Sequence, residues 1–110
     1  MPKRSTDKRS MLPEGLSKRS AALWEEVCAE WDLRRNHYVL LEVALRALDR
    51  MDQARAEIKK RGLLVTTRSG YTRANPAIMV ERDARNGFLN SWKSLGFDLE
   101  PPKDVGRPPG

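Results

Sequence analysis

The run "HYVLLEVALRAL", residues 37–48, constrains the fold of this chain more than any other feature. Only Glu42 and Arg46 interrupt its apolar residues between Tyr38 and Leu48. A helix that is apolar nearly all round must be covered on several sides, and a single domain within 110 residues can hardly supply that cover. We therefore expect this run to be central in the fold and also to form an oligomer interface through Tyr38, Val39, Leu40, Leu41, Val43, Leu45 and Leu48.

Apolar residues at three- and four-residue spacing predict three main helices. The first begins near Ser17, a suitable N-cap, and the second runs from about Asn36 to Arg61. The third begins at the Asn75-Pro76 step. The glycines that follow the second and third helices act as stop signals, at Gly62 and Gly96.

The apolar stripes of these helices indicate the core. Trp24, Trp31 and Trp92 fall on the stripes, so we expect them to be core residues and not base-stacking platforms. Cys28 lies on the same stripe, which predicts a buried structural cysteine. Gly87, inside the third helix, lowers helix propensity and suggests a close approach of another backbone.

The predicted fold class is all-α. The segment "GLLVTTRSGYTRANP" between the second and third helices predicts either a short β-hairpin or an extended loop. Residues 1–13 read as a flexible basic arm, and residues 98–110 read as a Pro/Gly-rich tail. Residues 14–97 would then form the helical domain that oligomerises and engages DNA.

The net charge of +6 and a pI near 9.9 suit an anionic partner such as nucleic acid. The charge alternates in blocks, because residues 21–33 carry four acids and no base between two basic segments. Such blocks would let copies of the chain attract one another head to tail, although solvated helix faces also explain them. The candidate DNA-binding residues are Lys3, Arg4, Lys8, Arg9, Lys18, Arg19, Lys59, Lys60, Arg61, Arg68 and Arg73.

No constellation of residues indicates an enzyme. Glu81 and Asp83 lie two apart on a helix and point in different directions, and arginine neighbours would keep both ionised. His37 is the only histidine and lies at a helix start, where a surface or capping role is expected. Neither a phosphate-binding loop, a cofactor site nor a metal site is expected, and no segment is long and apolar enough to span a membrane.

Several segments together resemble one protein family. They are "GLSKRSAALWEEV" followed by Trp31 and Leu33, "LLEVALRALDRMDQAR", "GLLVTTRSG", "NPAIMVERDARNGFLNSWKSLGF" and the closing "GRPPG". From about Leu12 onward, the chain resembles the small subunit of the tailed-phage terminase, in the branch of short packaging proteins of siphophages and prophages. The stretch from residue 75 to 96 is the most specific part of the resemblance.

The resemblance implies an α-helical, non-catalytic protein that assembles into a homo-oligomeric ring in the cytoplasm of the bacterial host. Its implied partners are double-stranded viral DNA and the large terminase subunit, which carries the ATPase and the nuclease. Many family members carry a helix-turn-helix domain before the oligomerisation region, whereas this chain has a basic arm and one short helix there. The alternative hypothesis is a small dimeric DNA-binding regulator, which would bind a defined site with a large specificity ratio.

Overall fold

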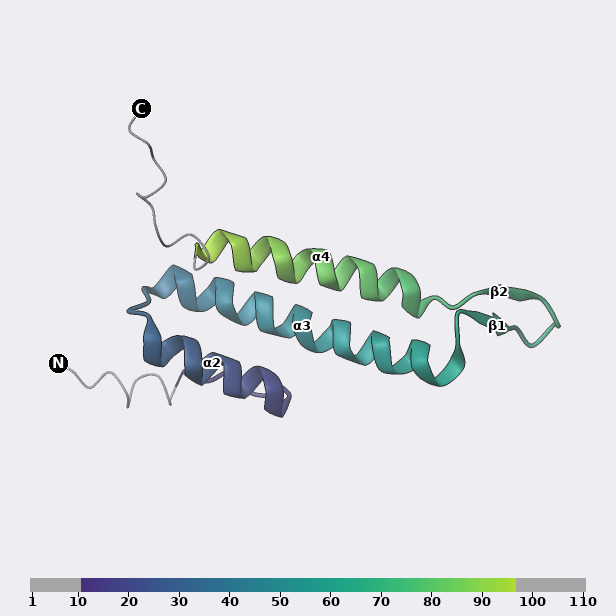
Figure 1. The fold of residues 1–110 in the computed structure, drawn as a ribbon, viewed down its shortest axis with the longest axis horizontal. Coiled ribbons are helices and arrows are strands. Elements are labelled where there is room, and N and C mark those ends of the chain that lie inside the picture. Colours follow the sequence, from purple (N-terminus) through teal and green to yellow (C-terminus); the bar gives the residue numbers. More distant parts are fainter. Residues whose placement is uncertain (1–10, 97–110) are drawn as a thin grey trace, which may run out of the picture.

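The computed structural model describes residues 11–96, which form three helices and a two-stranded hairpin (Figure 1). α2 spans Lys18–Glu30, α3 spans Arg35–Arg61 and α4 spans Ala77–Leu95. α4 returns antiparallel along α3, and α2 lies along the N-terminal half of α3 (Figure 1). The predicted all-α class, with a short hairpin between the last two helices, is confirmed.

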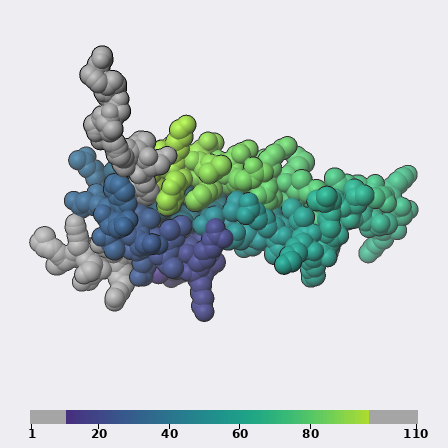
Figure 2. Space-filling model, viewed as in Figure 1, coloured from purple at the N-terminus to yellow at the C-terminus, as the bar shows by residue number. Residues whose placement is uncertain are grey.

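The hairpin consists of β1 (Leu64–Thr66) and β2 (Thr72–Ala74), which pair antiparallel with Val65 opposite Arg73. Its tip turns at Gly70, whose φ of 96° is in the left-handed region that favours glycine. The hairpin projects beyond the ends of α3 and α4, away from α2 (Figures 1 and 2).

α3 supplies the centre of the hydrophobic core. Its residues Leu41 and Leu45 have no exposed surface, and Cys28 of α2 is equally buried, as the sequence predicts. Leu95 at the end of α4 joins the same cluster. The buried apolar residues of this cluster are Trp24, Val27, Cys28, Leu41, Leu45, Leu48, Met51 and Leu95.

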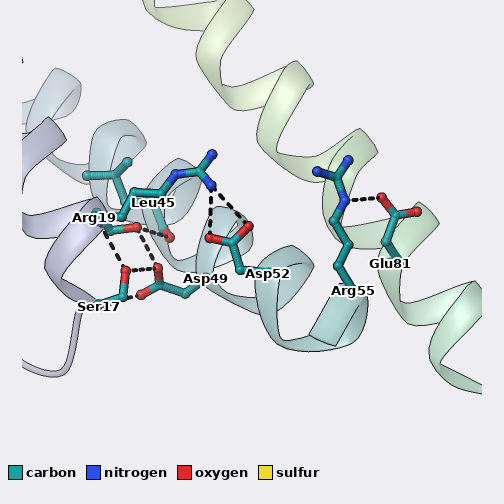
Figure 3. Close-up of polar contacts among 8 residues, drawn as sticks. Ser17, Arg19, Leu45, Asp49, Asp52, Arg55 and Glu81 are labelled. Carbon is teal, nitrogen blue, oxygen red and sulfur yellow. Dashed lines mark hydrogen bonds and ion pairs between the residues drawn. The ribbon is translucent and has the colours of Figure 1, made fainter. Parts of the chain in front are cut away.

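A polar cluster ties the start of α2 to the middle of α3 (Figure 3). The hydroxyl of Ser17 accepts the N–H of Ser20 at 3.1 Å, which confirms Ser17 as an N-cap. The carboxylate of Asp49 accepts the Ser17 N–H at 2.9 Å, the Ser17 hydroxyl at 2.6 Å and the Ser20 hydroxyl at 2.5 Å. Since Ser20 is fully buried, its hydroxyl needs this partner.

Two details at the α2–α3 junction differ from the prediction. α3 begins at Arg35, one residue before Asn36, and the Arg34 N–H donates to Nδ1 of His37 at 3.1 Å. His37 therefore has the capping role that was expected of it. The prediction that Trp31 is a core residue is wrong, because its side chain is 39% exposed. α2 ends at Glu30, and the backbone at Trp31 is extended, so the side chain does not continue the apolar stripe of the helix.

The start of α4 is fixed by Asn75, which is buried. Its Oδ1 accepts the N–H of Ala77 at 2.9 Å, and its Nδ2 donates to the carbonyl of Gly62 at 2.9 Å. The predicted capping by Asn75 is confirmed, and the same side chain also joins the end of α3 to the start of α4 across the base of the hairpin. Among the helices of residues 11–96, none has the length and apolar character to cross a bilayer.

α3 and α4 do not require a glycine at position 87. A Cβ added there would lie 3.9 Å from the Cβ of Ala47, an ordinary van der Waals contact. The close backbone approach that Gly87 suggested is therefore absent within the protomer.

We expect Gly87→Ala to raise the free energy of unfolding by about 0.5–1 kcal/mol, through helix propensity alone. Chemical denaturation would measure the change, and a less stable variant would contradict the α3–α4 packing described above.

Asp49 should make the stability of the protein depend on pH. Burial acts to raise its pKa, but the hydrogen bonds from Ser17 and Ser20 and the charge of Arg46 outweigh this, so the pKa lies below its ordinary value of 3.8. A depressed folded-state pKa gives stability that is complete above the unfolded pKa and is lost as pH falls through the folded one.

We therefore expect Asp49→Asn to destabilise the protein by about 1–2 kcal/mol at pH 7. The difference between the two proteins should shrink at pH values below 3.8. Urea denaturation of both proteins between pH 7 and pH 3 would measure this. A constant difference over the whole range would show that the Asp49 charge has no part in joining α2 to α3.

Candidate functional site

A basic region lies at the hairpin end of the molecule. Residues 58–80 contain no acid and five bases, and these are Lys59, Lys60, Arg61, Arg68 and Arg73. Three of them are in the last turn of α3, where cations also suit the negative end of the helix dipole. The bases of α3 and of the hairpin therefore concentrate positive charge at the hairpin end of the molecule.

Most of these bases have no protein partner. Arg61 pairs with Glu57 one turn earlier, at 2.8 Å. The side chains of Lys59, Lys60, Arg68 and Arg73 are exposed and form no hydrogen bond or ion pair with other residues in the range 11–96. Their charges are therefore free to neutralise an external anion.

Apolar side chains accompany the bases on the hairpin. Tyr71 is 72% exposed, and Leu63 and Leu64 are each more than 60% exposed. A two-stranded ribbon is narrow enough to enter the major groove of duplex DNA. The hairpin thus combines the charge, the exposure and the width that contact with a nucleic acid requires.

The other candidate DNA-binding residues lie elsewhere. Arg19 forms an ion pair with Asp52 of α3 at 3.3 Å (Figure 3), whereas Lys18 beside it is exposed and without a partner among the described residues. Asp52 precedes Lys59 by roughly 10 Å along the α3 axis. Lys18 and Arg19 therefore lie on the flank of the basic region and not within it. The four arm residues Lys3, Arg4, Lys8 and Arg9 are outside the described residues.

The seven expected interface residues separate into three groups by burial. Leu41, Leu45 and Leu48 are buried within the protomer, because α2 and α4 cover them, so they are not available to another chain. Tyr38 and Leu40 are partly buried and pack against the core. Only Val39 (58% exposed) and Val43 (51% exposed) present substantial apolar surface. If this run contacts another chain, the contact must therefore use the side of α3 that carries Val39 and Val43, which we call its open side.

A furrow lies between α3 and α4 on that open side. It has a volume of about 450 Å³ and is lined by Arg46, Ala47, Arg50, Val80, Asp83 and Ala84. Ala47 and Arg50 follow Val43 by one and two turns along α3, so they continue its stripe. This furrow was not predicted from the sequence, although the spacing of Val39, Val43 and Ala47 indicates one continuous face.

The carboxylates considered for catalysis have structural partners. Glu81 accepts hydrogen bonds from Arg85 of its own helix at 3.1 Å. It also accepts one from Arg55 of α3 at 3.1 Å (Figure 3). The hydrogen bond from Arg85, supported by Arg55, holds the pKa of Glu81 below its ordinary value. Glu81 therefore stays ionised and joins α3 to α4. Asp83 lies 3.7 Å from Arg82. Within residues 11–96 there is no group of three or more potential metal ligands.

Comparison with known protein families identifies the family of this chain. The family model of the phage terminase small subunit matches residues 20–107, which is well over half of the chain. The search of curated proteins gave no match, and the search of solved structures also gave none. The match includes α2 from Ser20 onward, the whole of α3 and α4, the basic hairpin and the furrow. This chain therefore belongs to the phage terminase small subunit family.

Proposed function

We propose that this chain is a non-catalytic adaptor of a phage DNA-packaging motor. In this proposal, copies of the chain assemble into a ring that engages double-stranded viral DNA in the cytoplasm of the bacterial host. The ring stimulates the large terminase subunit, which carries the ATPase and the nuclease. Family membership supports the packaging role, and the geometry of the chain supports the roles of its surfaces.

The basic hairpin end carries the DNA-binding part of the proposal. Four bases there have no partner within the described residues. Lysine and arginine in such an arrangement neutralise phosphates and release counterions without reading sequence. This favours binding with modest sequence preference, as an adaptor needs, over the large specificity ratio of a dimeric regulator.

Assembly is supported by the open side of α3. Val39 and Val43 are exposed there, beside the furrow formed with α4. A contact on this side would cover the remaining apolar circumference of α3 without disturbing the core. The non-catalytic role is supported by Glu81, because its carboxylate oxygens are engaged by Arg55 and Arg85 in joining α3 to α4.

The test removes charge from the hairpin end. We expect the triple variant Lys60→Gln/Arg68→Gln/Arg73→Gln to bind long duplex DNA more weakly. The slope of log K against log[salt] should fall by about 1 for each phosphate that the variant no longer neutralises. Fluorescence anisotropy over a range of salt concentrations would measure both quantities.

A matched control removes the same charge elsewhere. Arg34→Gln/Arg35→Gln/Lys93→Gln changes three bases at the start of α3 and the end of α4, far from the hairpin (Figure 1). It should retain most of the salt slope, and a truncation that lacks residues 1–10 would isolate the contribution of the arm. Equal reductions in the two triple variants would indicate nonspecific charge attraction and would contradict the hairpin site.

A further inference from the structure

The outer face of α2 has no partner within the described structure. Ala22, Glu25, Glu26 and Ala29 are all exposed and lie on the side of the helix that faces away from α3. Neither glutamate forms a hydrogen bond or ion pair with residues 11–96. This face is acidic. Its two alanines, seven residues apart, have small side chains that allow another surface to approach the helix closely.

The furrow between α3 and α4 has complementary properties. Arg50 lines it, and its side chain has no ion pair or hydrogen bond within the described residues. Arg46 adds a second guanidinium, which is held by Glu42 at 2.9 Å. The small side chains of Ala47 and Ala84 keep the furrow open between the two helices.

One acid also lines the furrow, and its charge is offset. Asp83 lies on the α4 wall, 3.7 Å from Arg82. Since Glu42 likewise offsets the charge of Arg46, the unpaired guanidinium of Arg50 gives the lining its positive charge. The outer face of α2, which is acidic and has small side chains, is therefore complementary to this furrow in both charge and shape.

The two faces lie on different sides of the protomer. α2 packs on α3 through contacts with Leu45, Asp49 and Asp52, whereas the α3 wall of the furrow consists of Ala47 and Arg50 with Arg46 at its edge. At 3.6 residues per turn, the centre of the first set is roughly 160° from the mean of Ala47 and Arg50. A copy seated in the furrow would therefore leave the protomer's own α2 free for the next copy.

We propose that the outer face of α2 in one protomer docks in the α3–α4 furrow of a second copy, with Glu25 and Glu26 facing Arg50. This inference deepens the proposed function, on which it rests, by naming the surfaces that join the ring. The contact is heterologous, because two different patches meet, and heterologous contacts close into rings when the rotation between copies permits. The contact would pair the acidic block of residues 21–33 in one copy with the basic segment that follows it in another copy.

Charge reversal of either face tests the contact. Arg50→Glu, or Glu25→Arg with Glu26→Arg, should weaken self-association of the full-length protein at least about tenfold. The combined triple variant should restore it, because the pairing is regenerated with reversed signs. Sedimentation equilibrium without DNA would measure the dissociation constant, and circular dichroism would verify that each variant is folded.

Lys93→Glu is the matched control, since it makes the same charge change as Arg50→Glu at an exposed site outside the furrow. It should assemble like the wild-type protein. If the wild-type protein is monomeric at every concentration, the proposed ring itself fails. If the wild-type protein assembles but Arg50→Glu does not weaken it, or the triple variant does not recover, only the docking contact is overturned.

Discussion

The structure depends on the way that α3 is covered. Its apolar circumference is too wide for one neighbour, so α2 packs on one side and α4 on another, and Leu41, Leu45 and Leu48 are buried between them. Asp49 fixes the position of α2 by accepting three hydrogen bonds from its first turn. Because α2 begins beside the middle of α3, it covers only the N-terminal half, and α4 alone accompanies the rest. A third side of α3 remains open, and it carries Val39, Val43 and the furrow.

This arrangement separates the surfaces that we assign to DNA and to assembly. The hairpin connects α3 to α4 beyond the reach of α2, so its bases collect at one end of the molecule without acidic neighbours. The acids of α2 lie along the body, near the opposite end of α3. A DNA polyanion would be attracted to the hairpin end and repelled by the α2 face, which leaves that face available to another copy.

Local signals in the sequence predicted most of the fold. Ser17 and Asn75 mark helix starts because their side chains accept backbone N–H groups within three residues, and Gly62 marks a helix end for similarly local reasons. Trp31 was misplaced because neither glycine nor proline marks the end of α2 at Glu30. The bond between Ser17 and Asp49 joins residues 32 apart, so no local pattern could reveal it. Likewise, the apolar run of α3 indicated that other elements must cover this helix. It did not indicate which of its residues α2 and α4 would bury.

The assignment of DNA to the hairpin end can be tested most directly by hydrogen–deuterium exchange of the full-length protein with and without a long DNA duplex. Exchange reports on backbone amides one peptide at a time, so it separates the two surfaces in a single experiment. We expect DNA to slow exchange in peptides that cover residues 62–74 and to leave the outer face of α2 unchanged. Protection confined to residues 18–30, with an unaltered hairpin, would contradict this account.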